Sequence, residues 1–325
     1  MRWFQKTKLK DWLRESDSAI VNKLNRWSLT MYLDPANTYT DIEARHILQP
    51  LLAVLQQAGM ANASSDARCI LGLVLGRDDP VLPHETIPRW TPDHQHQLEA
   101  LRQRRQRGEP ISRMRGWREF WSMRFDVSPA TLDPRPDSET VIAAAIGWAR
   151  DHRPAARILD LGTGSGCLLL ACLAELPQAT GIGIDISTEA VTVATANADR
   201  HGLGGRARFC QADFAADLTA HGQFDLILSN PPYIPTADIE RLDSDVRHFD
   251  PLAALDGGPD GLDCWRILCP QIATLLADAG AAFVEIGAGQ GKAVGRLGGA
   301  NKLCVAGSFA DLSGHERCLH LQKEI

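Results

Sequence analysis

The sequence predicts an α/β protein in which a small helical domain precedes an open, mostly parallel sheet. From residue 141 onward, short apolar segments of strand length alternate with segments that suit helices, which is the signature of such a sheet. Before residue 109 the apolar residues instead recur at helical spacing, and proline and glycine separate the segments. The length of 325 residues is typical of two domains.

Residues 41–108 are expected to be entirely helical, and the helical domain is placed at residues 48–115. The first helix has an apolar stripe and can end at Gly59. A second helix is expected over residues 64–76, and a third over residues 91–108, opened by a Thr-Pro pair. The stripe of the first helix consists of Ile47, Leu51, Leu52 and Leu55.

Residues 1–47 are interpreted as an N-terminal extension of unknown role. Its basic beginning lacks the apolar segment of a secretory signal. Four apolar residues share one helical face, which indicates either an accessory helix or a start codon placed too early. These residues are Leu9, Leu13, Ile20 and Leu24.

A connector is expected at residues 116–140 and the sheet domain at residues 141–325. Residues 119–129 alternate large apolar with small or charged residues, which predicts a β-hairpin. The sheet domain contains seven apolar segments; the first five suit parallel strands, and the last two are close enough to form an antiparallel pair. The seven segments are residues 156–162, 180–186, 207–213, 224–230, 281–287, 301–307 and 317–323.

The composition is that of an ordinary soluble globular protein, with 44% hydrophobic and 23% charged residues. A net charge of −6 argues against a protein that coats nucleic acid. No apolar run reaches the roughly 18 residues that span a membrane. The eight cysteines form no CxxC pair, and we expect reduced core thiols in a cytoplasmic protein that holds no metal.

The first predicted strand ends in the glycine-rich segment DLGTGSG at residues 160–166. Glycine allows the backbone to turn sharply and to approach a ligand, and the helix that follows directs free N–H groups toward it. A tight strand-to-helix turn without a ligand is the alternative. The candidate cofactor-binding residues of this segment are Asp160, Gly162, Thr163, Gly164 and Gly166.

Two further acids follow the next strands. Asp185 ends the second strand, where a carboxylate can accept the hydroxyls of a ribose. Asp213 follows the third strand, where it could accept a hydrogen bond from an exocyclic amine. Because the carboxyl ends of parallel strands meet at one edge of a sheet, we expect Asp160, Asp185 and Asp213 to line one ligand-binding crevice.

The fourth strand is followed by the sequence Asn-Pro-Pro-Tyr at residues 230–233. Two prolines fix the backbone and donate no hydrogen bond, so they hold neighbouring acceptors in place. The side-chain oxygen of Asn230 and the backbone carbonyl of Pro231 can each accept one N–H of a planar amino group. Pro232 stiffens the turn, and Tyr233 supplies a flat face.

Together, the glycine-rich segment, Asp185 and the SNPPYI segment resemble the S-adenosylmethionine-dependent methyltransferases that act on amide or amino nitrogens. Residues 109–139, 249–262, 285–291 and 311–319 are similar to the glutamine methyltransferases that modify peptide chain release factors. The similarity covers residues 48–325. Ser138 and Asp250 depart from the family, which has threonine and more often glutamate at these places.

The resemblance implies a Rossmann-like fold, S-adenosylmethionine as cofactor, and N5-methylation of the glutamine in the Gly-Gly-Gln motif of class I release factors. Asn230, Pro231, Pro232 and Tyr233 would form the catalytic segment, with Tyr233 packing on the acceptor amide. Phe120 and Trp121 of the connector are expected to wall the acceptor side. We expect a monomer whose partner is a release factor, with no membrane contact.

Three alternatives remain at this point. A ribosomal-protein glutamine would suit the same chemistry. An adenine-N6 nucleic-acid methyltransferase shares the Asn-Pro-Pro-Tyr sequence, and residues 102–118 are rich in arginine, but the acidic chain lacks a large target-recognition domain. A nicotinamide-dependent oxidoreductase or a non-catalytic nucleotide binder is disfavoured by Cys167, which stands where the dinucleotide fingerprint needs a small residue.

Overall fold

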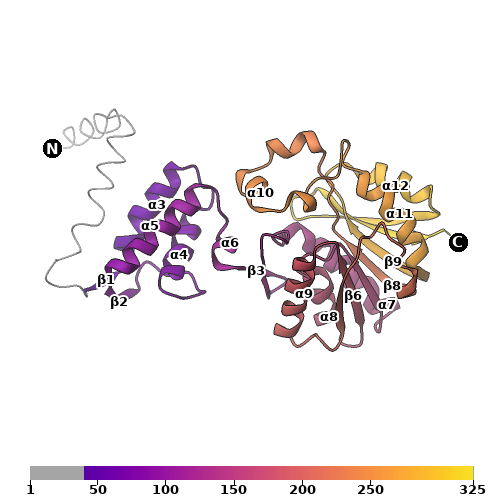
Figure 1. Ribbon diagram of the computed structural model, residues 1–325, viewed down its shortest axis with the longest axis horizontal. Coiled ribbons are helices and arrows are strands. Elements are labelled where there is room, and N and C mark those ends of the chain that lie inside the picture. Colours follow the sequence, from indigo (N-terminus) through magenta and orange to yellow (C-terminus); the bar gives the residue numbers. More distant parts are fainter. Residues whose placement is uncertain (1–39, 325) are drawn as a thin grey trace. The chain divides into compact units, whose positions relative to one another are not determined.

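The computed structural model describes residues 40–324, and these residues form two compact units (Figure 1). The first unit ends at Arg115 and the second begins at Gly116. The accessory helix predicted within residues 1–39 lies outside the described residues.

The first unit is mainly helical, and its three predicted helices are confirmed. They are α3 (Arg45–Gln57), α4 (Ala63–Val74) and α5 (Pro92–Gln106), with the short helix α6 (Ile111–Arg115) after them. Thr91 caps α5, because its side-chain oxygen accepts a hydrogen bond from the backbone N–H of His94 at 3.2 Å. This cap explains why the third helix begins at the Thr-Pro pair.

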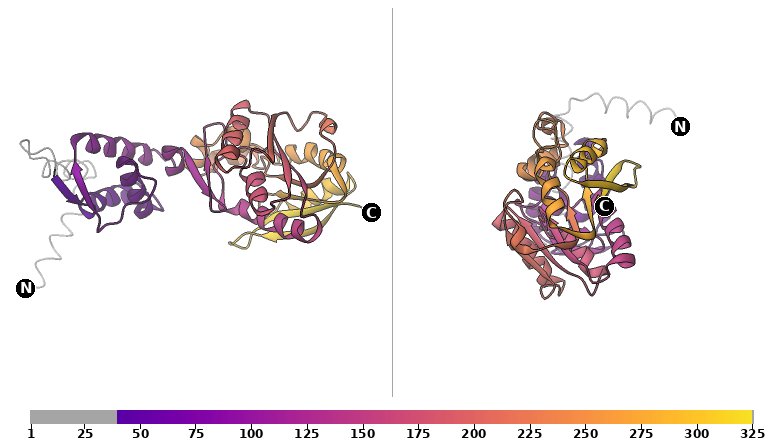
Figure 2. Two further views of the ribbon diagram at one scale, coloured as in Figure 1. Left: turned by 90° about the horizontal axis from the view of Figure 1, so that it is seen from below. Right: turned by 90° about the vertical axis from the view of Figure 1, so that its right-hand side faces the viewer.

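The expectation that residues 41–108 are entirely helical is wrong, because the first unit also contains two strands. Strand β1 (Thr40–Glu43) pairs with β2 (Thr86–Trp90) in an antiparallel arrangement (Figure 2). Strands of four and five residues are too short to give a clear alternating pattern, and Pro88 removes one donor from β2. The core of this unit includes Ile42, so the unit begins before the predicted boundary at residue 48.

The arginine-rich segment at residues 102–118 is largely neutralised on its helical part. Three of its arginines form ion pairs with acids of the same unit, so less positive charge remains for nucleic acid than the sequence indicated. The pairs are Arg102–Glu99, Arg104–Glu109 and Arg105–Asp66.

The second unit opens with the predicted hairpin, which is confirmed as β3 (Trp117–Phe120) and β4 (Met123–Asp126). Trp121 and Ser122 form its two-residue turn, and both have positive φ values, 52° and 55°. Positive φ at both central residues gives the turn the twist that a two-residue hairpin needs.

The seven-stranded sheet is also confirmed, with the order β10-β11-β9-β8-β5-β6-β7. The strands from β9 to β7 in this order are parallel, and β11 pairs antiparallel with β9 and β10. The bounds are β5 (Arg157–Leu161), β6 (Thr180–Asp185), β7 (Ala207–Gln211), β8 (Phe224–Ser229), β9 (Leu276–Glu285), β10 (Leu303–Ala310) and β11 (Glu316–Lys323).

Helices cover both faces of this sheet, as Figure 1 shows for α8 and α9 against α11 and α12. In β8, Leu226 and Leu228 face the core under α7 and α8, whereas Ile227 faces the core under α11 and α12. The helices are α7 (Glu139–His152), α8 (Cys167–Glu175), α9 (Thr188–Arg200), α10 (Ser244–Phe249), α11 (Asp263–Leu275) and α12 (Gly291–Gly299). Short 3-10 helices span Pro136–Ser138, Thr219–His221, Thr236–Arg241 and Leu252–Ala254.

All eight cysteines lie within the described residues, and all are free thiols. Across residues 40–324 we find no helix with the length and apolar character needed to cross a bilayer. The same residues contain no group of three or more His, Cys, Asp or Glu side chains arranged to hold a metal ion.

Candidate active site

The register of the sheet brings the predicted site residues to one edge. Leu161 at the end of β5 pairs with Ile184 of β6 on one side and with Ser229 of β8 on the other. The segments that follow these strands therefore leave the sheet together. The chain adds β6 and β7 on one side of β5 and then places β8 on its other side, so the strand order reverses next to β5. Open α/β sheets bind ligands at such a reversal.

A cavity of about 470 Å³ lies at this edge, and we call it the crevice. Seven of the predicted residues line it, and they come from the carboxyl ends of four strands and the loops that follow them. They are Gly162, Thr163, Gly164, Asp185, Asp213, Asn230 and Pro232.

Gly162 and Gly164 turn the backbone where it borders the crevice. Both have positive φ, 76° and 54°, and a Cβ at either position would meet nothing within 4 Å. The backbone therefore borders open space that a ligand can occupy. Gly166 differs, because it does not line the crevice and a Cβ there would lie 3.1 Å from Ala194 and from Phe209. Its part is to let the start of α8 pack closely against its neighbours.

Asp160 lies beneath the glycine-rich segment, completely buried, and does not line the crevice. Its carboxylate accepts a hydrogen bond from the hydroxyl of Thr163 at 2.6 Å, which ties the loop to the end of β5. Burial raises the pKa of Asp160 to about 7, although the Thr163 hydroxyl opposes this shift. Asp160 thus supports the loop from below.

Asp185 braces the same loop from the side. One carboxylate oxygen accepts from the Gly164 N–H at 2.8 Å, and the other accepts from the Ser187 N–H at 2.9 Å. An ionised carboxylate has about four acceptor positions, so two remain for hydroxyl groups of a ligand. Asp213 is exposed at the crevice, where it accepts a hydrogen bond from the Ala215 N–H at 2.8 Å.

The Asn-Pro-Pro-Tyr segment borders two cavities. A second cavity of about 220 Å³, which we call the acceptor cavity, is lined by Asn230, Tyr233 and Glu285 among others. Asn230 lines the crevice as well, so it stands where the two spaces meet. Pro231 is buried and lines neither cavity, and its carbonyl accepts no hydrogen bond from the described residues.

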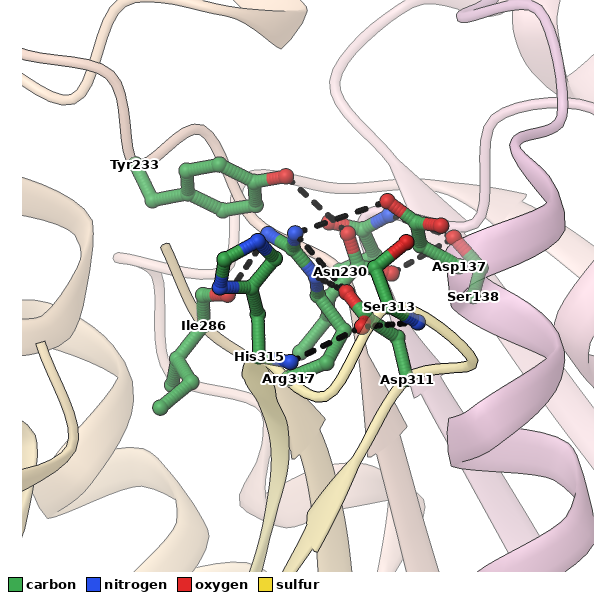
Figure 3. A network of polar contacts seen from close by, with 10 residues as sticks. Asp137, Ser138, Asn230, Tyr233, Ile286, Asp311, Ser313, His315 and Arg317 are labelled. Carbon is green, nitrogen blue, oxygen red and sulfur yellow. Dashed lines mark hydrogen bonds and ion pairs between the residues drawn. The ribbon is translucent and has the colours of Figure 1, made fainter. Parts of the chain in front are cut away.

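Two polar residues that sequence reasoning did not place in the site connect Asn230 with Tyr233 (Figure 3). The Nδ2 group of Asn230 donates to Ser138 Oγ at 3.1 Å, and Ser138 donates to Glu285 Oε2 at 2.5 Å. The Tyr233 hydroxyl donates to Glu285 Oε1 at 3.0 Å. Glu285 is 1% exposed, and burial raises the pKa of its carboxyl group. The only signal in the sequence was that both residues lie in segments similar to the family.

The segment at residues 249–262 closes around the Asn-Pro-Pro-Tyr turn. The Ile234 N–H donates to the Leu255 carbonyl at 3.0 Å, and the Gly257 N–H donates back to the Ile234 carbonyl at 2.8 Å. A Cβ on Gly257 would lie 2.8 Å from the Tyr233 Cα. Gln290 donates to the Tyr233 carbonyl at 2.9 Å from the other side. The glycines of this segment are therefore required by close backbone packing.

Arg135 also lines both cavities. It forms an ion pair with Asp250, whose side chain is only 2% exposed, and the other Asp250 oxygen accepts from the Asp133 N–H at 3.2 Å. This pair fixes the guanidinium group at the junction of the crevice and the acceptor cavity. Asp250 therefore holds Arg135 and the backbone at Asp133, and aspartate is long enough to make both interactions where the family more often has glutamate.

The expectation that Phe120 and Trp121 wall the acceptor side needs correction, because neither lines the two cavities. Phe120 is buried in the core between the sheet and its helices, with its ring edge-on to Phe125. Trp121 packs against the same core, and its indole N–H donates to Glu175 at 3.2 Å. Hairpin residues with large apolar side chains are equally suited to a core, and here the core holds them.

The crevice fits S-adenosylmethionine. The bare glycine backbone leaves room for the ligand, and Asp185 keeps free acceptor positions for ribose hydroxyls. Ile186, 62% exposed, and Phe214 add apolar surface beside Asp213, as a purine ring with an exocyclic amine requires. The donors and acceptors of the site thus match the parts of this cofactor.

The fold and the crevice define an S-adenosylmethionine-dependent methyltransferase. Two family models match the chain, one described as "Methyltransferase domain" over residues 152–265 and one as "PrmC N-terminal domain" over residues 46–116. The chain belongs to the release factor glutamine methyltransferase family, because it is 49% identical to a protein of that name from Rhodospirillum rubrum over 82% of this chain and 80% of the relative.

Two other relatives carry the same name. The protein from Bradyrhizobium diazoefficiens is 44% identical over 84% of this chain and 92% of the relative. The protein from Agrobacterium fabrum is 38% identical over 83% of this chain and 93% of the relative. The shared length includes both units of the described structure.

Proposed function

We propose that this protein transfers a methyl group from S-adenosylmethionine to the side-chain amide nitrogen of the glutamine in the Gly-Gly-Gln motif of class I release factors. The position of Asn230, which lines both the crevice and the acceptor cavity, carries this proposal. A side chain at that junction can hold an amide at the place where a cofactor and an acceptor meet. Membership in the family supports the identity of the acceptor.

Asp185, Asp213 and the backbone at Gly162 and Gly164 would hold the cofactor. S-adenosylmethionine supplies a methyl group on a positively charged sulfur. The chain's own contribution on this side is to keep the loop in one conformation, through the hydrogen bonds of Asp160 to Thr163 and of Asp185 to Gly164. A preformed loop reduces the conformational entropy lost on binding.

Asn230 and Pro231 would bind the acceptor amide. An amide nitrogen is a poor nucleophile because its lone pair is delocalised into the carbonyl group. When the Asn230 Oδ1 and the Pro231 carbonyl accept its two N–H groups, the lone pair is directed to one side, and positioning then supplies much of the rate. These two hydrogen bonds strengthen as the nitrogen becomes cationic. The resulting N-protonated amide is strongly acidic, so its proton leaves without a dedicated base.

Tyr233 would pack beside the acceptor amide, and the first unit would contact the release factor. We further propose that the protein acts as a monomer in the cytoplasm, where release factors work on ribosomes. The free state of all eight cysteines supports a reducing compartment.

The test is methyl transfer from labelled S-adenosylmethionine to a purified class I release factor. The expected result is label on the factor that disappears when its Gly-Gly-Gln glutamine is replaced. A ribosomal-protein preparation and adenine-containing DNA serve as competing acceptors. Label on ribosomal protein alone, or on DNA alone, would overturn the proposal. Label on DNA would indicate that the Asn-Pro-Pro-Tyr segment binds adenine.

A further inference from the structure

We propose that Glu285 and Ser138 are positioning residues that determine which way the Asn230 amide faces, so that its oxygen is directed to the substrate. This inference rests on the proposed function, because it explains how the acceptor amide of that reaction is held. Neither residue needs to contact the methyl group. Both act through the side chain that they orient.

The three residues form a chain of hydrogen bonds that comes from distant parts of the sequence. Ser138 stands at the start of α7, Asn230 follows β8, and Glu285 ends β9. The Ser138 side chain lies between the other two, with Oγ 3.1 Å from Asn230 Nδ2 and 2.5 Å from Glu285 Oε2. Ser138 is 3% exposed, so water does not compete for its hydroxyl group.

The chemistry of the groups fixes the direction of this chain. Both oxygens of Glu285 accept from hydroxyl groups, Oε2 from Ser138 and Oε1 from Tyr233, and in its ionised form the carboxylate can only accept, so the single proton of the Ser138 hydroxyl points to Glu285. The oxygen of Ser138 then has only lone pairs left for Asn230. Asn230 must therefore turn its NH₂ group to Ser138, and its Oδ1 is left for another donor. Within the described residues, Oδ1 has no hydrogen-bond partner.

Hydroxyl groups face the carboxyl group of Glu285 on both sides. Its second oxygen already accepts from the Tyr233 hydroxyl, so both oxygens face hydroxyl donors. The pKa of Glu285 is raised, chiefly by burial, and the hydrogen bonds from Ser138 and Tyr233 together with the positive charge of Arg317 oppose this shift and favour the ionised form. Arg317 is itself held by Asp311, 3.1 Å away, and lies near Asp137 in Figure 3. One carboxylate thus sets the positions of both Asn230 and Tyr233.

An Asn230 amide turned the other way would present NH₂ to the substrate amide, and two donors would then face each other. The correct orientation therefore matters for the acceptor and not for the cofactor. Loss of a hydrogen bond to a charged group reduces the rate by roughly 10- to 100-fold. We expect kcat to fall by this factor when the hydrogen bonds between Asn230, Ser138 and Glu285 are broken, with little change in cofactor affinity.

The first experiment compares Ser138→Thr with Ser138→Val, two side chains of the same shape that differ in the hydroxyl group. Ser138→Thr should retain most of kcat, and Ser138→Val should lose roughly 10- to 100-fold. Glu285→Gln should lose a similar factor, because glutamine can donate as well as accept. The double variant Ser138→Val/Glu285→Gln should be no slower than the slower single variant, because both changes interrupt the same series of hydrogen bonds.

Equal activity of Ser138→Thr and Ser138→Val would overturn the proposal, and so would losses that multiply in the double variant. Multiplied losses would mean that the two residues act independently, for example by supporting the packing. Calorimetric titration with S-adenosylmethionine checks that each variant is folded and keeps its cofactor affinity.

A second measurement needs no substrate. In ¹⁵N-labelled protein, the side-chain NH₂ signal of Asn230 is identified by its loss in Asn230→Asp. Its protons should exchange slowly with water in the wild type and in Ser138→Thr, and faster in Ser138→Val. Unchanged exchange in Ser138→Val would refute the orienting role. If the wild type labels no release factor, the proposed function fails, yet this measurement still decides the role of Ser138.

Discussion

Asn230 and Glu285 are neighbours because the residues before them, Ser229 of β8 and Val284 of β9, are paired in register. The two strands are parallel, so their carboxyl ends deliver both side chains to the same place. The Asn-Pro-Pro-Tyr segment and residues 285–291 are therefore parts of one site, although Tyr233 and Glu285 are 52 positions apart in the sequence. The same register explains how the buried carboxyl group of Glu285 comes to line the acceptor cavity.

Replacement of Asn230 by alanine is expected to reduce turnover far more than cofactor affinity. The change leaves one N–H of the acceptor amide without a partner, which costs roughly 1–3 kcal/mol. The measurement is kcat with a saturating release factor, together with the Kd of S-adenosylmethionine. Gln178→Ala, which removes an exposed side-chain amide between α8 and β6, is the control. Equal losses in turnover and in cofactor affinity would contradict the acceptor role.

Replacement of Asp185 by asparagine is expected to reduce cofactor affinity more than turnover. Its carboxylate holds the Gly164 and Ser187 N–H groups and has acceptor positions left for ribose hydroxyls. The variant should weaken S-adenosylmethionine binding by roughly 10- to 100-fold, because charge-assisted hydrogen bonds are lost. Turnover at saturating cofactor should change less. Asp213→Asn, at an exposed position of the same crevice, should weaken cofactor binding less. A larger loss of affinity in Asp213→Asn than in Asp185→Asn would contradict the main role given to Asp185.

Gly257 should not tolerate a side chain, whereas Gly205 should. A Cβ at Gly257 would lie 2.8 Å from the Tyr233 backbone, so the Asn-Pro-Pro-Tyr turn would have to move. A Cβ at Gly205 would meet nothing within 4 Å. We expect Gly257→Ala to lower kcat while S-adenosylmethionine still binds, and Gly205→Ala to behave like the wild type in the same two assays. A fully active Gly257→Ala enzyme would show that the turn is not held by this packing.

Much of the fold could be predicted from the sequence because local patterns carry it. Short apolar segments that alternate with helices identify the seven strands, and the glycine loop and acids at the strand ends locate the crevice. The strands β1 and β2 were missed because four or five residues give little periodicity. Phe120 was misplaced because a large apolar residue in a hairpin has the same pattern whether it lines a site or fills a core.

The polar chain beneath Asn230 could not be predicted for a different reason. Ser138 and Glu285 are 147 positions apart in the sequence, and only the register of β8 and β9 and the start of α7 bring them together. A serine before a helix is normally interpreted as a cap. A glutamate at the end of a strand is normally expected to face water. Their role depends on contacts that no local pattern encodes.

The pKa of Asp160 should make the stability of the protein depend on pH. Its pKa is raised from 3.8 to about 7 in the folded protein, mainly because the group is buried. In the unfolded chain it ionises near pH 4. The folded state therefore binds one more proton than the unfolded state between about pH 4 and pH 7, so the stabilisation by the neutral form is complete below this window and is lost as the pH rises through it.

Asp160→Asn removes this titration while an oxygen remains for the Thr163 hydroxyl. The difference in unfolding free energy between wild type and variant should change by up to about 1.4 kcal/mol per pH unit from pH 5 to pH 7, with the wild type losing stability. Above pH 8 the difference should level off. Urea denaturation at several pH values measures it, and Asp278→Asn, with a side chain 98% exposed, is the control. Parallel curves for the wild type and Asp160→Asn would show that Asp160 is already ionised beneath the loop.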